Sequence, residues 1–289
     1  MAFKTPLEIA AAGTAVGEKK AKTSADKLVV AGFLGGAYIA FGGLLAIVVS
    51  AGINPDIFGG LTTLFTGAVF SLGLILVIIA GSELLTGNMA LVPMAVWQGR
   101  ASLEGLGRNL ALVLLGNLIG SLFVAYFLGV QTGVIAHDEQ LARLGQIATA
   151  KAIDETDLQV FLRAIGCNWL VCLAVWMSLS AEQISGKILA IFFPIMAFVA
   201  MGFDHVVANM FFLPAAIFAG VPEIGWGDVL MNWLFAFLGN FVGAAIFVGG
   251  FYYYLYARPE DSPEKKASGR DMPGDQPLAE HRREEVGIK

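Results

Sequence analysis

Charged residues are scarce in this sequence. They make up 14% of the 289 residues, whereas hydrophobic residues make up 57%. A typical soluble domain has about a quarter of its residues charged. The charges that are present gather at the two ends, and long apolar runs fill the chain between about 28 and 256. This deficit excludes an ordinary soluble domain and indicates an integral membrane protein.

Cysteine and histidine are also rare. Cys167 and Cys172 lie in one apolar segment and fit neither a disulfide framework nor a metal site, so we expect them to be packing residues. Of three histidines, only His205 lies in a predicted span, which is too few for a redox enzyme with several intramembrane ligands. A membrane protease could use a pair of acids, and Glu83 and Asp204 are the only such pair at membrane depth. We therefore predict no catalytic residue, no cofactor and no metal site, and keep a membrane enzyme that uses these groups as an alternative.

The two ends of the chain differ from its middle. The N-terminus lacks the apolar centre of a secretory signal. Residues 1–27 carry five lysines, and Leu7, Ile9 and several alanines share one helical side, which predicts a cytoplasmic amphipathic segment; a solvated leader is the alternative. Residues 257–289 are rich in charge, which predicts a disordered cytoplasmic tail. Between them we expect a transmembrane domain at 28–256.

Six apolar segments are predicted, and two of them are too long for one span. The segments cover about 28–50, 62–97, 107–129, 159–181, 187–219 and 229–256. A helix over 62–97 would be about 54 Å long, but the hydrocarbon core of a bilayer is about 30 Å thick. The polar stretches GSELLTGNM (81–89) and GFDHVVANM (202–210) therefore predict breaks in helices 2 and 5.

The two halves of the chain resemble each other. Asn109 corresponds to Asn232 and Asn117 to Asn240 at an offset of 123, and the two polar stretches correspond at an offset of 121. Three spans per half would invert the second half in the membrane, so we expect an inverted 3+3 repeat. In such repeats, paired broken helices meet at a substrate path near the midplane.

The distribution of basic residues predicts the orientation. Lysine and arginine concentrate on one side of the predicted spans, which places both termini in the cytoplasm. The exception is the outer loop 130–158, which contains Arg143 and Lys151. This basic pair on the opposite side requires a specific reason.

The broken helices suggest an anion site. Each break starts a new half-helix whose N-terminus has partial positive charge, which favours an anion. Glycine permits the unusual dihedral angles of a break, and we expect the acids to cap the free N–H groups of the second half-helices. We expect Asn117 and Asn240 to satisfy neighbouring backbone groups. The predicted structural residues of the breaks are Gly81, Glu83, Gly87, Asn88, Gly202, Asp204 and Asn209.

His205 is the residue that composition and position single out. An ionisable group at membrane depth is usually functional, and an imidazole can donate or withhold a proton near neutral pH. A structural histidine with satisfied hydrogen bonds is the alternative. The sequence predicts a role for His205 in a pore.

Together these stretches resemble the formate/nitrite transporter family. The resemblance covers about 28–256 and rests on FSLGLILVIIAGSELLTGN (70–88), LGNLIG (115–120), CNWLVCLAVWMS (167–178) and GFDHVVANMFFLP (202–214). It implies an all-α homopentamer. Each protomer is aquaporin-like, has six transmembrane helices and contains its own pore. Two positions depart from the family pattern, because Leu85 stands where Phe is frequent and Asp204 where Glu is commoner.

The resemblance also implies roles for single residues. His205 corresponds to the family's central pore histidine, Thr86 to its partner threonine, Asn168 to the asparagine beside the histidine and Lys151 to the lysine of the outer vestibule. The apolar constrictions of the family correspond to Phe70, Leu74, Leu84, Val171 and Phe198. The residue pattern alone would place those five side chains in a core.

The function implied is passage of small monovalent anions of weak acids through the cell membrane. We expect formate or nitrite as substrate, with a proton lent by His205, and keep hydrosulfide and lactate as alternatives within the family. A neutral-solute facilitator would have Asn-Pro-Ala at both half-helices, but TGNM and VANM contain no proline. A purely structural protein would not need two polar breaks. The expected partners are these anions, membrane lipid and further copies of the chain, with no nucleic acid.

Overall fold

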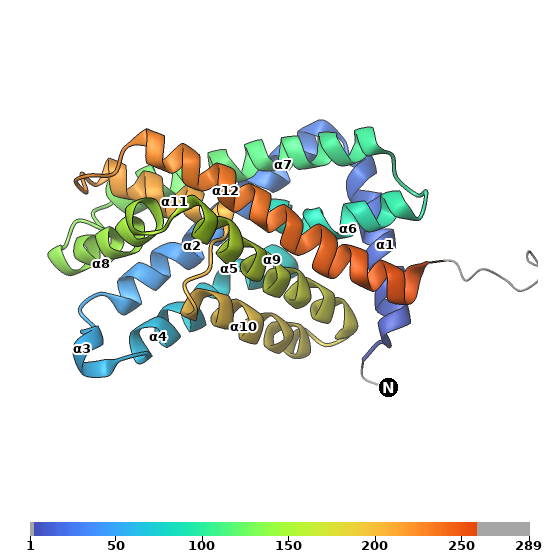
Figure 1. Cartoon of the computed structure of the whole chain (residues 1–289), viewed down its shortest axis with the longest axis horizontal. Helices are drawn as coiled ribbons and strands as arrows, with labels where there is room; N and C mark the ends of the chain where they lie inside the picture. Colours follow the sequence, from blue (N-terminus) through green and yellow to red (C-terminus); the bar gives the residue numbers. More distant parts are fainter. Residues whose placement is uncertain (1–2, 259–289) are drawn as a thin grey trace, which may run out of the picture. The chain divides into compact units, whose positions relative to one another are not determined.

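The computed structural model describes residues 3–258, which form an all-α structure without a strand in that range, apart from one bridge between Phe3 and Ala181 (Figure 1). The predicted tail 257–289 lies almost wholly outside the described residues. The elements are α1 (Pro6–Lys22), α2 (Ala25–Ser50), α3 (Pro55–Phe58), α4 (Leu61–Phe70), α5 (Leu72–Leu76), η1 (Val77–Gly81), α6 (Leu85–Trp97), α7 (Leu103–Phe123), η2 (Val124–Val130), α8 (Asp138–Thr149), η3 (Ala150–Asp154), α9 (Asp157–Ser180), α10 (Ile184–Ala200), α11 (Val206–Phe218), α12 (Trp226–Ala244), η4 (Ala245–Gly250) and η5 (Tyr253–Ala257).

Five helices of the described chain are long and apolar enough to cross a membrane, and the chain is a multi-pass membrane protein. They are Ala25–Ser50, Leu61–Gly81, Leu103–Val130, Asp157–Ser180 and Trp226–Ala257. The fifth predicted segment, 187–219, is divided between α10 and α11, which are apolar but shorter. The predicted segment 62–97 likewise consists of a spanning helix followed by the short helix α6.

Both predicted breaks are confirmed. The first separates η1 from α6 at residues 82–84, and the second separates α10 from α11 at residues 201–205. Each break begins at a glycine in the left-handed region, Gly81 with φ +87° and Gly202 with φ +71°. An L side chain rarely adopts these angles, so glycine lets the backbone leave the helix at both points.

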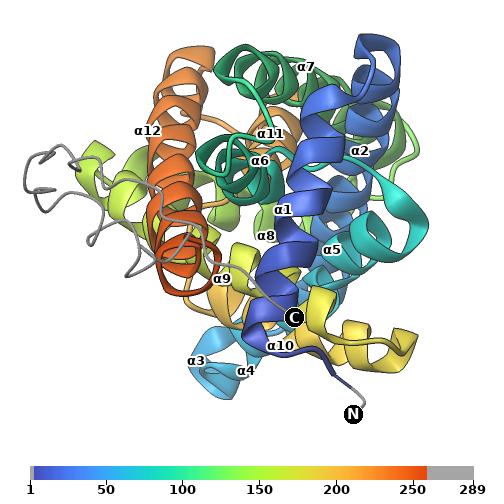
Figure 2. The ribbon, with the colours of Figure 1, turned by 90° about the vertical axis from the view of Figure 1, so that its right-hand side faces the viewer.

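The N-terminal helix packs on the bundle. Thr5 and Glu8 form a capping box that starts α1. Ile9 and Ala10 are buried against Met94 of α6 and Trp176 of α9, and Figure 2 shows α1 lying across the bundle beside α6. This burial does not fit a solvated leader.

The long loop between the third and fourth spans contains structure that the sequence analysis missed. It folds into α8 and the π-helical turn η3, at the end of the bundle away from α1 (Figure 1). Leu144 and Ala148 of α8 are fully buried. The loop is therefore part of the packed domain, and its charged residues are held in place.

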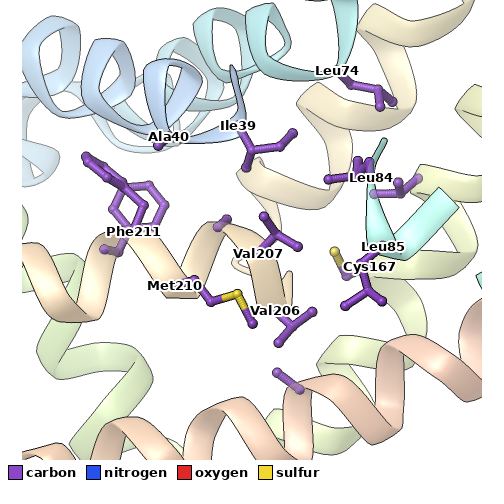
Figure 3. Packing of buried hydrophobic residues seen from close by; sticks show 14 of the residues in the cluster. Ile39, Ala40, Leu74, Leu84, Leu85, Cys167, Val206, Val207, Met210 and Phe211 are labelled. Carbon is purple, nitrogen blue, oxygen red and sulfur yellow. The ribbon is translucent and has the colours of Figure 1, made fainter. Parts of the chain in front are cut away.

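One hydrophobic core joins the spans and the two breaks. Figure 3 shows Ile39 of α2 and Leu74 of α5 in the same cluster as Leu84, Leu85 and Val206, which lie where α6 and α11 begin. All five side chains are at most 3% exposed. The polar breaks are thus surrounded by tightly packed apolar groups, where an unpaired polar atom is costly.

Candidate functional site

The first break is held by an asparagine from α7. Asn117 Oδ1 accepts a hydrogen bond from the Leu85 backbone N–H at 2.9 Å, and its Nδ2 donates to the carbonyls of Gly32 at 2.7 Å and Glu83 at 2.9 Å. A side-chain amide both accepts and donates. One buried residue therefore satisfies an N–H and two carbonyls of unwound backbone.

The second break has the same arrangement. Asn240 Oδ1 accepts from the Val206 backbone N–H at 2.9 Å, and its Nδ2 donates to the carbonyls of Ala164 and Asp204, both at 2.8 Å. The predicted backbone role of Asn117 and Asn240 agrees with these bonds.

The prediction that Glu83 and Asp204 cap the half-helices is wrong. Their carboxylates accept from side chains. The first N–H of each half-helix donates to an asparagine oxygen, and His205 Nδ1 accepts from Ala208 as the N-cap of α11. A carboxylate can only accept, so it could not also satisfy the exposed carbonyls of the breaks.

Glu83 belongs to a chain of polar side chains that ends on α1. Its Oε2 accepts from Lys20 Nζ and from Asn88 Nδ2, both at 2.7 Å. Asn88 Nδ2 also donates to Asn109 Oδ1 at 2.9 Å, and Asn109 Nδ2 donates to the Lys20 carbonyl at 3.0 Å. We call these four residues the Glu83 network. It neutralises a partly buried carboxylate with a lysine.

Asp204 has an equivalent set of partners, which we call the Asp204 network. Its Oδ1 accepts from Lys151 Nζ and Asn209 Nδ2 at 2.8 Å. Asn209 Nδ2 donates to Asn232 Oδ1 at 2.8 Å, and Asn232 Nδ2 donates to the Lys151 carbonyl at 3.0 Å. The correspondence that the sequence shows between Asn109 and Asn232 thus extends to bonded atoms.

A histidine–threonine pair joins the two breaks. His205 Nε2 lies 2.8 Å from Thr86 Oγ1, and both side chains are buried. The Ala208 backbone N–H donates to His205 Nδ1 at 3.1 Å, so that nitrogen has no hydrogen. His205 is therefore the neutral tautomer with its hydrogen on Nε2, which it donates to Thr86. The hydroxyl hydrogen of Thr86 stays free for another acceptor.

The backbone of Thr86 is held by α9. Asn168 Nδ2 donates to the Thr86 carbonyl at 3.2 Å and to the Asn240 carbonyl at 2.8 Å. Cys172 Sγ donates to the same Thr86 carbonyl at 3.3 Å. Asn168 therefore positions Thr86 through its backbone. Cys172 was expected only to pack, and its contact with Thr86 is a finding of the structure.

The five residues predicted to form apolar constrictions are buried, with at most 3% of each exposed. The rings of Phe70 and Phe198 meet edge to face at 5.9 Å, and Phe198 stacks on His205 at 6.0 Å. Phe212, which the sequence analysis did not select, stacks on Phe70 at 6.4 Å. The aromatic groups thus lie on one side of the histidine.

Two cavities lie near the two breaks, and residues of both halves of the chain line each of them. The first, of about 320 Å³, is lined by Phe70, Phe198 and His205 together with Lys151, and we call it the Lys151 cavity. The second, of about 430 Å³, is lined by Leu74, Leu84, Gly87, Glu83 and Lys20, and we call it the Lys20 cavity. Gly87 lies within α6 and not in the break itself.

Several charged residues of the Lys151 cavity were missed by sequence reasoning. Arg143 and Lys151 were noted as an exception to the charge distribution, and the reason is that both line this cavity. Arg143 donates to Ser50 Oγ at 2.8 Å and Thr66 Oγ1 at 3.2 Å. Glu155 and Arg163 also line it. The sequence context of Glu155 is that of a solvated loop residue, whereas Arg163 lies in the predicted span 159–181, where a charge is a signal of function.

Lys20 was predicted only as part of a basic segment. The Lys20 side chain, which pairs with Glu83, is 17% exposed, close to the 13% of the Lys151 side chain, which pairs with Asp204. Since α1 lies outside the predicted repeat, no offset pointed to it. The equivalence of the two acids could have prompted a search for a second lysine.

Comparisons with known proteins agree with this geometry. The model of the family described as formate/nitrite transporter matches residues 7–254. The transporter YrhG of Bacillus subtilis is 50% identical over 91% of this chain and 97% of its own. A probable formate transporter of Methanothermobacter thermautotrophicus is 47% identical over 89% of this chain and 98% of its own.

A solved structure has the same fold. A pentameric formate channel with formate bound superposes with a TM-score of 0.72 at 32% identity, covering 81% of this chain and 98% of the channel. The chain belongs to the formate/nitrite transporter family.

Proposed function

We propose that the protein conducts formate, and with it nitrite, across the cytoplasmic membrane together with a proton. The observation that supports this most directly is the Thr86–His205 pair between two cavities, each with a lysine. We also propose a homopentamer with both termini in the cytoplasm, based on the pentameric relative and on the basic residues of 1–27. The Lys151 cavity then faces outward.

The lysines attract the anion. A positive charge in a recessed, low-dielectric site raises the local concentration of anions. Lys151 and Lys20 are largely buried and paired, yet both line their cavities and keep N–H groups available. An anion would therefore be favoured at either mouth.

The apolar ring is the barrier to a bare anion. Burying an unpaired charge among Phe70, Phe198 and Leu84 costs several kcal/mol or more, whereas a neutral weak acid crosses such a region readily. The free hydroxyl hydrogen of Thr86 can bond the anion at the edge of this ring. The anion then needs a proton.

His205 can relay that proton. The Nε2 hydrogen passes to Thr86 Oγ1, and the hydroxyl hydrogen of Thr86 passes to an oxygen of the anion. Because a neutral imidazole does not readily give up its only hydrogen, Nδ1 has to take a proton from the solution side in the same step. The bond to the Ala208 N–H is given up, and the neutral acid crosses the ring.

Flux into proteoliposomes tests this function. Formate, nitrite, hydrosulfide and lactate are supplied at two pH values, while an enclosed pH dye reports proton movement. We expect formate and nitrite uptake accompanied by proton entry, and loss of both in His205→Phe. The matched control is His137→Phe, because His137 is exposed before α8. Wild-type formate and proton uptake in an assembled His205→Phe protein would refute the relay.

A further inference from the structure

Two carboxyl groups lie beside the Lys151 cavity: Glu155 lines it, and Asp204 accepts a hydrogen bond from its lysine. Glu155 follows η3 and its side chain is 7% exposed, while the side chain of Asp204 is fully buried. Each has one oxygen in an ion pair: Glu155 Oε1 accepts from Arg163 Nη1, and Asp204 Oδ1 accepts from Lys151 Nζ. The second oxygen of each group remains to be explained.

Both second oxygens lack a hydrogen-bond partner among the described residues. These atoms, Glu155 Oε2 and Asp204 Oδ2, are both buried. The two side chains lie within hydrogen-bonding reach. Ionised carboxylates only accept hydrogen bonds and repel each other. A single proton between the two oxygens would satisfy both and remove the repulsion.

We propose that Glu155 and Asp204 bind one proton between them beside the Lys151 cavity, and that this proton favours binding of the substrate anion there. The second part rests on the proposed function. The cavity contains three cationic groups, on Arg143, Lys151 and Arg163. Holding the proton cancels one of the two opposing negative charges, so the field that attracts an anion becomes stronger.

The surrounding charges decide when the proton is bound. Burial raises the pKa of Glu155, and the charge of Asp204 raises it further, to about 8 against the opposing effect of Lys151 and Arg163. Two more acids, Asp157 and Asp228, border Glu155 in a neighbouring hollow of about 190 Å³, and their negative charges also favour the protonated form.

The charged or titratable groups around Glu155 are Lys151 and Asp154 on η3, Asp157 and Arg163 on α9, Asp204 in the break, Asp228 on α12, and Arg143 and His205 across the cavity.

The site exists on one side of the bundle. The Lys20 cavity is lined by a single acid, Glu83, among the described residues. Glu83 Oε2 already bonds Lys20 and Asn88, and no second carboxyl group of residues 3–258 lines that cavity. Proton binding of this kind therefore belongs to the Lys151 cavity alone.

Infrared spectroscopy tests the proton site without any transport. In the wild-type protein we expect the carbonyl stretching band of a buried protonated carboxyl, lost as pH rises through about 8. Glu155→Gln should remove this band, and Asp154→Asn, which changes the exposed neighbouring acid, should keep it. Absence of a titrating band in the wild type would overturn the proposal, as would its persistence in Glu155→Gln. A metal cation bridging the two carboxylates would also leave the band absent.

Formate flux tests the linkage. The apparent affinity of the wild type should fall by about fivefold as pH rises through about 8, the effect of one unit charge several ångströms away in a half-hydrated site. Glu155→Gln should keep the higher affinity across that range, because its amide can donate to Asp204 as the protonated acid does. Asp154→Asn should follow the wild type.

The outcomes separate the two proposals. A Glu155→Gln protein with the wild-type dependence of affinity on pH would refute the linkage. If Glu155→Gln fails to assemble, the wild-type infrared band decides alone. A titrating band in a protein that passes no anion would contradict the proposed function and leave the proton site standing.

Discussion

The Glu83 and Asp204 networks have the same bonds but differ in their surroundings. In each, a lysine and an asparagine bond the acid, a second asparagine closes the ring, and distances agree within about 0.1 Å. Glu83 is 15% exposed and its lysine comes from α1, whereas Asp204 is fully buried and its lysine comes from η3. The equal bonds indicate a shared structural task, and the different burial indicates that the halves handle charge differently.

The largest expected effect concerns the asparagines that hold the breaks. Asn117→Ala and Asn240→Ala each strand one N–H and two carbonyls in the core. At about 1–3 kcal/mol for each unsatisfied buried group, both should lose several kcal/mol and much of their assembled protein. Thermal unfolding in detergent measures this, with the exposed Gln131→Ala as control. A loss in only one of the two would break the equivalence of the halves.

The next effect concerns the bond between Thr86 and His205, which joins the two halves. Thr86→Val removes the hydroxyl that His205 contacts, and Thr86→Ser keeps it. A hydrogen bond to a charged group contributes about 1.5–3 kcal/mol, so formate flux should fall about tenfold to a hundredfold in the valine variant only. Equal flux in the valine and serine variants would show that the methyl group, and not the hydroxyl, matters.

The third effect concerns Lys151 and Lys20, which line the two cavities on opposite sides of the proposed pore. Lys151→Ala should weaken apparent affinity for external formate and Lys20→Ala that for internal formate, each by about threefold to tenfold at low salt. High salt should reduce both effects, because screening acts over about 8–10 Å. Uptake and efflux assays on oriented vesicles measure them. Identical effects of either variant in both directions would show that the lysines do not act at separate mouths.

The smallest effect concerns the outer surface of α1. Arg100 pairs with Glu18 at 3.1 Å, but its side chain is 47% exposed. Exposed pairs contribute about 0–1 kcal/mol, so Arg100→Ala should leave thermal stability nearly unchanged. Lys20→Ala should lower it more, since it leaves Glu83 with one partner fewer. A larger loss of thermal stability in Arg100→Ala than in Lys20→Ala would show that α1 is held mainly by its surface ion pair and not by the Glu83 network.

Length and repetition made much of this fold predictable. Segments 62–97 and 187–219 exceed a bilayer, so breaks had to exist, and their polar stretches showed where. The repeated Asn117 and Asn240 pointed to buried backbone bonds. The caps were mispredicted because a carboxylate and an amide are both frequent at an N-cap, and only the exposed carbonyls of the break select the amide.

The charges around the Lys151 cavity were beyond prediction for a different reason. Glu155 belongs to a polar loop, and its burial depends on how α8 and η3 fold back over the bundle. Arg163 lies in the predicted span 159–181, and its pairing with Glu155 depends on the same arrangement. Lys20 depends on how α1 docks. These are tertiary arrangements between distant segments, which neither periodicity nor a local motif records.

His205, the proposed proton relay, also caps the first turn of α11. Its Nδ1 accepts from the N–H of Ala208 and closes the first turn of that helix. The same nitrogen cannot hold a proton and accept this bond. Each proton that Nδ1 gains therefore removes one capping hydrogen bond from the N-terminus of α11, so the protonation state of the ring is coupled to the order of the first turn of that helix. Amide exchange at Ala208 would follow the occupancy of the ring.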